Sequence, residues 1–181
     1  MTTAVAPSGL ADDVALAEAL ALGPDVWDGL LTRSGAANPF MTWAWHRACV
    51  DAAPPEAAAS SRAVLLRGGA GSVAAIFPYR LQSDAFWGLP VTTMGWAFGD
   101  LGCPDHLDII ASPESDLDAL AGALESLPWV AVRLGSVAER ASNVERWLEA
   151  CKRRGWTIRR RRVGRCLYLD LPESWEAYLG G

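Results

Sequence analysis

The sequence has few of the features that would place it outside the ordinary globular proteins. Its 181 residues include four scattered cysteines, Cys49, Cys103, Cys151 and Cys166, and no close-spaced pair of the Cys-x-x-Cys type, which favours reduced thiols. No segment approaches the roughly 18 uncharged apolar residues that a membrane span requires. The first positive charge is Arg33, so the amino terminus lacks the basic region of a signal peptide. We therefore expect a protein of the bacterial cytoplasm.

Several common catalytic motifs are also missing. The chain contains no GxxxxGK[ST], GxGxxG or GxSxG sequence, which removes the usual sequence support for nucleotide hydrolysis and for serine hydrolase chemistry. The glycine-rich stretch Arg67–Ser72 resembles a phosphate loop only superficially. The residues after it alternate as a strand does, whereas a phosphate loop opens a helix, so we predict a hairpin turn there.

What the sequence does contain is typical of one folded domain. Apolar residues make up 51% and charged residues 20%, and nine tryptophans stand against three tyrosines and four phenylalanines. We expect some of these indoles to line a cleft or an interface. The net charge of −5 is unevenly distributed, because residues 151–166 hold 8 of the 16 basic side chains and no acidic one.

Hydrophobic periodicity predicts an α/β (α+β) domain with one mixed, mostly antiparallel sheet flanked by helices. Residues 12–22 fit either a strand or a helix. We expect Leu117, Leu120, Leu124, Trp147 and Leu148 to be buried against the sheet. The expected helices are residues 25–33, 42–51 and 142–154, one opened by Pro113 or Ser115 and stopped by Pro128, and the start of one at 172–181. Ser142 and Glu145 have the spacing of a capping box for the helix at 142–154. The expected strands are residues 62–67, 72–82, 87–98, 129–137, 156–162 and 165–171.

Two short pairs suggest a metal site. His46-x-x-Cys49 on a helix and Cys103-x-x-His106 on a loop could together supply a tetrahedral set of two nitrogens and two sulfurs. Sequence does not show whether the pairs meet, and a buried cysteine commonly acts as a small apolar residue. We therefore predict no metal.

A polar loop at residues 99–108 contains the other candidate catalytic groups. Asp105, His106 and Asp108, with Asp100, follow a predicted strand, and a carboxylate beside a histidine could act as a general base or orient an amine. An ordinary solvated turn rich in aspartate explains the same residues. Both interpretations stay open.

The basic cluster divides into two parts. Lys152, Arg153 and Arg154 end a helix, where cations offset the negative end of its dipole. Arg159, Arg160, Arg161 and Arg162 could bind an anion such as a phosphate, or could pair with the acidic remainder of the chain. With no aromatic residue among these arginines and an acidic whole, we predict no nucleic-acid binding.

Four motifs resemble those of bacterial proteins in the CelD/BcsL (FemAB-like) branch of the GNAT acyltransferases, and the likeness covers most of residues 12–179. These are Asn38-Pro39-Phe40 before a helix bearing Trp43 and Trp45, Phe77-Pro78-Tyr79, Asp105-His106-Leu107-Asp108, and Leu171-Pro172-Glu173-Ser174-Trp175. His106 departs from the tyrosine that the family often has in its aspartate loop.

The resemblance implies a protein of two GNAT-like halves. Residues 1–171 would be the first half, residues 172–181 would begin a connecting helix, and the missing carboxy-terminal half would bind acetyl-CoA or another acyl-CoA. The GNAT pyrophosphate turn, Arg/Gln-x-x-Gly-x-Gly/Ala at a helix start, is absent from residues 99–113. We therefore expect the isolated chain to be inactive and to bind no cofactor alone.

Two classes of function follow from this resemblance. The chain is either the acceptor-binding half of an N- or O-acyltransferase of polysaccharide biosynthesis, acting on a small-molecule, saccharide or amine acceptor, or a non-catalytic binding or scaffold domain. In the first case we expect Asp105, His106 and Asp108 to lie at the mouth of a cleft shared with Trp43, Trp45 and His46.

Overall fold

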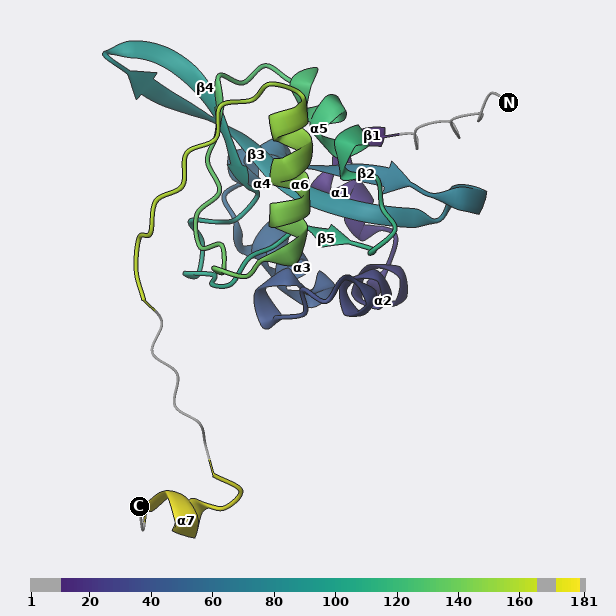
Figure 1. Ribbon diagram of the computed structural model, residues 1–181, viewed down its shortest axis with the longest axis vertical. Helices are drawn as coiled ribbons and strands as arrows, with labels where there is room; N and C mark the ends of the chain where they lie inside the picture. Colours follow the sequence, from purple (N-terminus) through teal and green to yellow (C-terminus); the bar gives the residue numbers. More distant parts are fainter. Residues whose placement is uncertain (1–10, 166–171, 180–181) are drawn as a thin grey trace.

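A single mixed sheet forms the centre of the computed structural model, which describes residues 11–165 and 172–179 (Figure 1). The strand order is β1-β2-β3-β4-β6, and every pairing is antiparallel except the parallel contact of β4 with β6. This confirms the predicted fold class. The strands are β1 (Ala11–Ala15), β2 (Ser61–Arg67), β3 (Val73–Phe86), β4 (Leu89–Trp96), β5 (Ile110–Ala111) and β6 (Ala131–Val132).

The long strand β3 pairs with two strands in succession, and this pairing creates the polar loop. Its outer part, from Tyr79 to Phe86, pairs with β4, and its inner residues Ala75 and Ile76 pair with β5. Residues 97–109 leave the sheet between these two pairings. The loop that the sequence analysis identified is therefore an excursion from one edge of β3.

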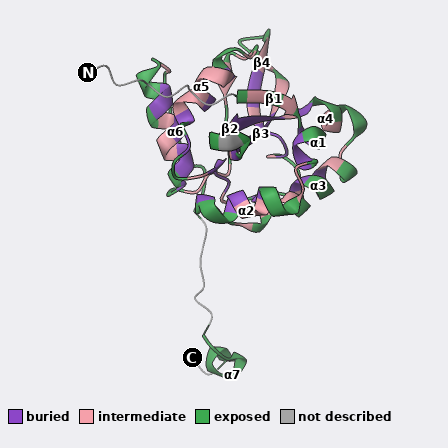
Figure 2. Ribbon diagram, turned by 90° about the vertical axis from the view of Figure 1, so that its right-hand side faces the viewer, coloured by how far each residue is buried: buried purple, intermediate pink, exposed green. Residues whose placement is uncertain are grey.

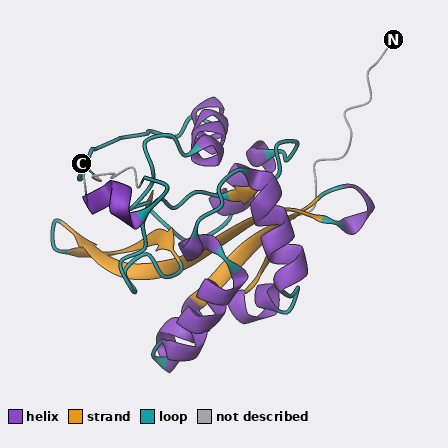
Figure 3. Cartoon of the chain, turned by 90° about the horizontal axis from the view of Figure 1, so that it is seen from below, coloured by secondary structure: helices purple, strands orange, loops and turns teal. Residues whose placement is uncertain are grey.

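Helices cover both faces of the sheet (Figures 2 and 3). Helices α5 and α6 pack together on one face, and α1 and α3 lie on the other, with α2 against β3 and β5. The helices are α1 (Leu16–Leu20), α2 (Pro24–Ser34), α3 (Trp43–Ala52), α4 (Pro55–Ser60), α5 (Leu117–Glu125), α6 (Ser142–Arg153) and α7 (Trp175–Leu179), with short 3-10 turns η1 (Pro39–Met41) and η2 (Gly69–Gly71). In the described part of the chain, no helix has both the length and the apolar character needed to cross a membrane.

Aromatic packing joins α6 to the sheet. The ring of Phe77 on β3 lies 6.0 Å from Trp147 of α6 and 5.3 Å from Trp96 of β4, measured between centroids. The predicted burial of Leu117, Leu120, Leu124 and Trp147 is confirmed, whereas Leu148 is only half-buried at the rim of the core.

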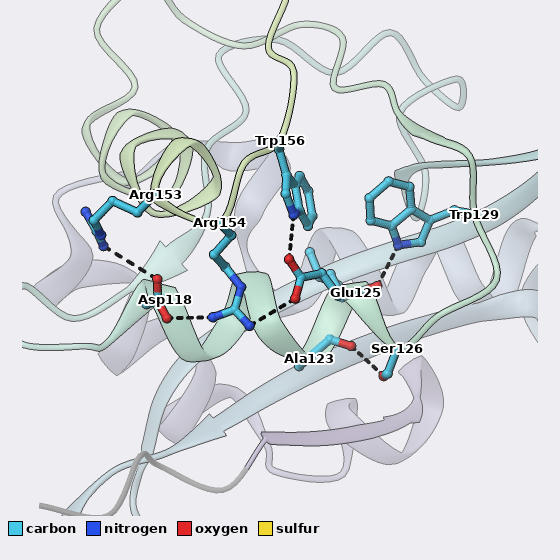
Figure 4. A network of polar contacts seen from close by, with 9 residues as sticks. Asp118, Ala123, Glu125, Ser126, Trp129, Arg153, Arg154 and Trp156 are labelled. Carbon is cyan, nitrogen blue, oxygen red and sulfur yellow. Dashed lines mark hydrogen bonds and ion pairs between the residues drawn. The ribbon is translucent and has the colours of Figure 1, made fainter. Parts of the chain in front are cut away.

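An ionic clamp holds α5 against the end of α6 (Figure 4). The guanidinium of Arg154 donates to Asp118 at 2.7 Å and to Glu125 at 2.9 Å, so one side chain contacts both ends of α5. Glu125 also accepts from the indole of Trp156 at 2.7 Å. Gly155, at a φ of 83°, follows the end of α6, because glycine tolerates the left-handed conformation that this helix cap needs.

Three sequence predictions need correction. Residues 12–22 are both a strand and a helix, since β1 runs directly into α1. Residues 51–61, where their alanines and prolines predict a surface connection, contain α4, and the strand expected at 129–137 is limited to β6. The Gly-rich turn does join β2 to β3 as a hairpin.

The strand expected at residues 156–162 is wrong. These residues have no regular structure. Arg160 and Arg162 reach back to carboxylates on and beside α6, and among the described residues no strand pairs with this segment. The strand expected at 165–171 lies almost entirely outside the described residues.

Candidate functional site

The polar loop is attached to the segment that leads into α3. The side-chain amide of Asn38 donates to the carbonyl oxygen of His106 at 2.8 Å, while its Oδ1 accepts from the backbone of Phe40 at 2.9 Å and starts the turn η1. The backbone N–H of Asp108 points at the sulfur of Met41, 3.2 Å away. Two segments about 60 residues apart in sequence therefore lie against each other.

Trp45 and Gly102 form a second contact between these segments. A Cβ placed on Gly102 would lie 2.7 Å from Cη2 of Trp45, closer than side-chain carbons approach, and Gly102 has a φ of 68°. Only glycine satisfies both conditions without strain. Trp45 also meets Phe40 edge-on, with ring centroids 5.0 Å apart, so the loop rests on an ordered aromatic pair.

Trp43 and His46 act within the protein interior. The indole N–H of Trp43 donates to the carbonyl of Leu20 at 2.8 Å. His46 is 8% exposed, and its Nδ1 lies 3.1 Å from the carbonyl oxygen of Thr42, one helical turn earlier. Burial lowers the pKa of His46 to about 4 despite this hydrogen bond and the nearby charge of Asp28. His46 is therefore neutral at pH 7, with Nδ1 as the donor.

Asp108 is buried and caps the start of α6. Its Oδ1 accepts from the backbone of Ile109 at 2.8 Å and of Val144 at 2.7 Å, and its Oδ2 accepts from the backbone of Asn143 at 3.2 Å. Desolvation raises the pKa of Asp108, while these backbone donors and Arg146 oppose the rise. The carboxylate thus supplies the negative charge that a helix start favours.

This arrangement replaces the capping box predicted at Ser142 and Glu145. The residue before α6 is Ala141, which has no side-chain cap, and Glu145 forms an ion pair with Arg160. Spacing along a helix cannot reveal a cap that comes from a loop 34 residues away, so this prediction was wrong for a tertiary reason.

Asp105 and His106 have surface exposure, as does Asp100, which pairs with Arg80 at 2.8 Å. Asp105 is exposed and His106 is partly exposed, with a φ of 56°. The next residue, Leu107, donates to the carbonyl of Ser136 at 2.8 Å and forms a parallel bridge with Val137. A left-handed histidine is uncommon and persists only where its surroundings fix it, which here are Asn38 and the Leu107 bridge.

The two histidine–cysteine pairs do not assemble a metal site. Within residues 11–165 and 172–179, no group of three or more His, Cys, Asp or Glu side chains is placed to hold a metal ion. Cys49 is buried in the core, which agrees with its interpretation as an apolar residue, and Cys103 is exposed.

Two of the four candidate anion-binding arginines pair with carboxylates. Arg160 makes a two-pronged contact with Glu145, at 2.8 and 2.6 Å, and Arg162 reaches Glu139 at 3.0 Å. Arg159 and Arg161 are exposed and form no ion pair with a described residue. Arg160 and Arg162 therefore pair with acidic residues of the chain, whereas Arg159 and Arg161 stay candidates for binding an anion.

The helix starts near the loop are unsuited to a pyrophosphate. Asp28 accepts from the backbone of Trp43 at the start of α3 at 2.8 Å, and Asp108 caps α6. Each of these starts therefore already has a carboxylate on the N–H groups that an anionic ligand would need. The residues described around this loop do not fit the phosphates of an acyl-CoA.

Two open pockets lie away from the loop. One of about 530 Å³ lies between β1 and α5 and is lined by residues that include Asp13, Asp118 and Arg154. Another of about 310 Å³ lies beside the Gly-rich turn, with Arg33 and Ser115 on its wall. Neither includes a candidate acceptor residue, so the cleft expected between the loop and α3 stays a prediction.

Sequence reasoning missed the residues that position the loop. Asn38 was noticed as part of an Asn-Pro-Phe motif, which signals a capped turn, but its bond to His106 spans 68 residues. The requirement for glycine at position 102 was indicated only weakly in the sequence, by a glycine inside a short polar loop. Nothing in the sequence indicated that Trp45 packs against this glycine.

Comparison with known proteins yields similar structures only. No protein-family model and no curated protein matches the chain. The crystal structure of a probable acetyltransferase has 10% identity and a TM-score of 0.49, covering 91% of this chain and 99% of the other. A tetramutant of the BH1408 protein from Bacillus halodurans has 11% identity and a TM-score of 0.44, covering 90% of this chain and 99% of the other.

Proposed function

We propose that this chain is the acceptor-binding, amino-terminal half of a GNAT-type acyltransferase of the CelD/BcsL (FemAB-like) branch. Residues 1–171 would form this half, and residues 172–181 would begin the helix that connects it to a second half holding the acyl-CoA. The observation that carries the proposal is the loop at residues 99–108, which is fixed on the Asn38–Trp45 segment and presents Asp105 and His106 at the surface.

The loop provides groups suited to an amine or hydroxyl acceptor. A carboxylate such as Asp105 could hold an ammonium or hydroxyl hydrogen, and the imidazole of His106 could accept the proton that the acceptor loses as its nitrogen or oxygen forms the new bond. Fixed backbone geometry at His106 favours this role, because a base must be held within hydrogen-bond reach of the proton that it removes. Asp108 and His46, being buried, would position the loop and α3 instead.

The two capped helix starts support assigning the acyl donor to the other half. A pyrophosphate needs several converging N–H donors, and Asp28 and Asp108 already accept from the starts of α3 and α6 beside the loop. In the complete protein we place this half in the bacterial cytoplasm, with a saccharide or amine acceptor of polysaccharide biosynthesis.

A non-catalytic binding domain is the second candidate. The observation that favours it is that two titratable groups of the predicted site, Asp108 and His46, have structural partners. This candidate predicts acceptor binding without any proton transfer in the complete protein.

Acceptor binding can be measured directly on this chain. In two-dimensional NMR, an amino sugar, a neutral sugar and an alkyl diamine are titrated separately while the Trp45 indole and His106 imidazole signals are followed. We expect at least one ligand to shift both signals, with affinity at least about tenfold weaker in an Asp105→Asn, His106→Gln double variant. Glu114→Gln, an exposed acid outside the loop, is the matched control. No shift with any ligand, or equal affinity in the double variant, would reject the acceptor site.

A further inference from the structure

The described residues place most of their large exposed apolar side chains on two protruding elements. Ten such side chains are exposed, and six belong to either the β3–β4 hairpin tip or helix α7. We call Phe86, Trp87 and Leu89 the arm tip, and Trp175, Tyr178 and Leu179 the α7 stripe. Figure 1 shows the hairpin and α7 projecting from opposite ends of the molecule.

The arm tip is an ordered apolar surface. Trp87 is 91% exposed, Leu89 is 67% exposed, and the rings of Phe86 and Trp87 stack with centroids 5.2 Å apart. Trp87 and Gly88 both have positive φ, at 51° and 78°, which gives the tight turn whose twist suits a hairpin. Strand pairing continues without interruption to Phe86 and Leu89, so the arm presents these side chains in a fixed arrangement.

The surroundings of the arm tip favour an apolar protein partner. No charged residue occurs from Ala85 to Thr92, and the nearest charge, Asp84, pairs with Arg133. A partner that bound through charge would find no opposite charge on this surface.

Helix α7 also presents an exposed apolar face, which could pack on the apolar arm tip. Trp175, Tyr178 and Leu179 are spaced at i, i+3 and i+4, so they share one face, and Trp175 stacks on Tyr178 at 5.3 Å. All five residues of α7 are exposed. An isolated helix of five residues is unstable in water, so packing on an apolar surface would stabilise α7.

We propose that two copies of this chain associate by reciprocal exchange, with the α7 stripe of each copy packed on the arm tip of the other. One such contact would bury about 600 Å², which is too little for a stable complex, whereas the two equivalent contacts of a twofold dimer would bury about 1,200 Å², within the range of specific interfaces. The chain between Arg162, which is tied to Glu139, and Trp175 can extend roughly 40 Å, so α7 can reach a neighbouring molecule. This inference goes beyond the proposed function and concerns the 181-residue chain; a second half joined through residues 172–181 would compete with the arm tip for the α7 stripe.

Sedimentation velocity of the 181-residue chain tests the association. We expect a dimer at micromolar concentration, and a dissociation constant raised at least about tenfold by either Trp87→Asn or Trp175→Gln. Asn-Gly is a favoured pair in this type of hairpin turn, so the first variant keeps its fold. Val26→Gln, a change at another exposed apolar position, should leave the dimer unchanged.

Mixing the two variants tests the exchange itself. In an equimolar mixture one contact is intact, because the Trp87→Asn chain supplies a normal α7 and the Trp175→Gln chain supplies a normal arm. We expect the mixture to associate more tightly than either variant alone. A monomeric wild type, a dimer that tolerates either substitution, or a mixture no tighter than its components would overturn the proposal.

Discussion

Asp108 is a buried carboxylate that stabilises the fold, although burial of a charged group usually costs stability. Its charge is withdrawn from water, but three backbone N–H groups and the start of α6 surround it. An acidic residue in a polar loop would ordinarily be interpreted as a solvated or catalytic group. Here it joins the loop to α6.

Replacing Asp108 with alanine should lower the free energy of unfolding by about 3 kcal/mol, because three buried donors lose their acceptor. Urea denaturation at pH 7 measures the change. Asp105→Ala is the matched control, and since Asp105 is exposed its effect should be within about 0.5 kcal/mol. Equal effects of the two substitutions would contradict the assignment of Asp108 as a cap.

His46 should make stability depend on pH. Its pKa is about 4 in the folded chain against the ordinary 6.5, so the unfolded state binds more protons between these values. The free energy of unfolding should therefore fall as the pH is lowered from 6.5 to 4, by about 3 kcal/mol from this residue. The comparison is the slope of wild type against His46→Gln over that range.

The His46→Gln variant should lose the part of the slope that His46 contributes. A wild type and a His46→Gln variant with the same slope would show that His46 is not withdrawn from solvent.

The contact between the loop and α3 depends on glycine at position 102. Gly102→Ala places a Cβ 2.7 Å from the Trp45 ring and forces alanine to a φ of 68°, which should cost about 2 kcal/mol of stability. Chemical denaturation measures it, and the acceptor affinity should fall as well if the loop is the binding element. Gly135→Ala, where nothing lies within 4 Å, should change neither quantity.

At the scale of elements, the sequence pattern predicted those helices and hairpins that interactions between neighbouring residues determine. The helices at residues 25–33, 42–51 and 142–154 and the hairpin of β2 with β3 were found because periodicity and turn residues specify them within a few positions. The boundary inside residues 12–22 and the irregular course of 156–162 depend on β2 and on the ion pairs of Arg160 and Arg162. Those are contacts with distant residues, and the local sequence does not specify them.

At the scale of the whole molecule, the mixed sheet with helices on both faces followed from the order of the expected elements, and the loop followed from its composition. The packing of that loop on the Asn38–Trp45 segment could not be predicted from composition. It depends on the pairing of β3 with both β4 and β5, which brings Asn38, Trp45 and Gly102 together. The candidate site was thus predicted as two separate segments, and the fold explains how they come together.

The account as a whole holds that this chain contributes acceptor binding and that the acyl donor is held elsewhere. Isothermal titration calorimetry with acetyl-CoA at physiological salt tests this most directly. We predict no binding tighter than millimolar, because Asp28 and Asp108 already accept from the helix starts beside the loop, and any attraction to Arg159 and Arg161 would be weak and screened by salt. A micromolar or tighter dissociation constant would contradict the account and would place the donor site within this chain.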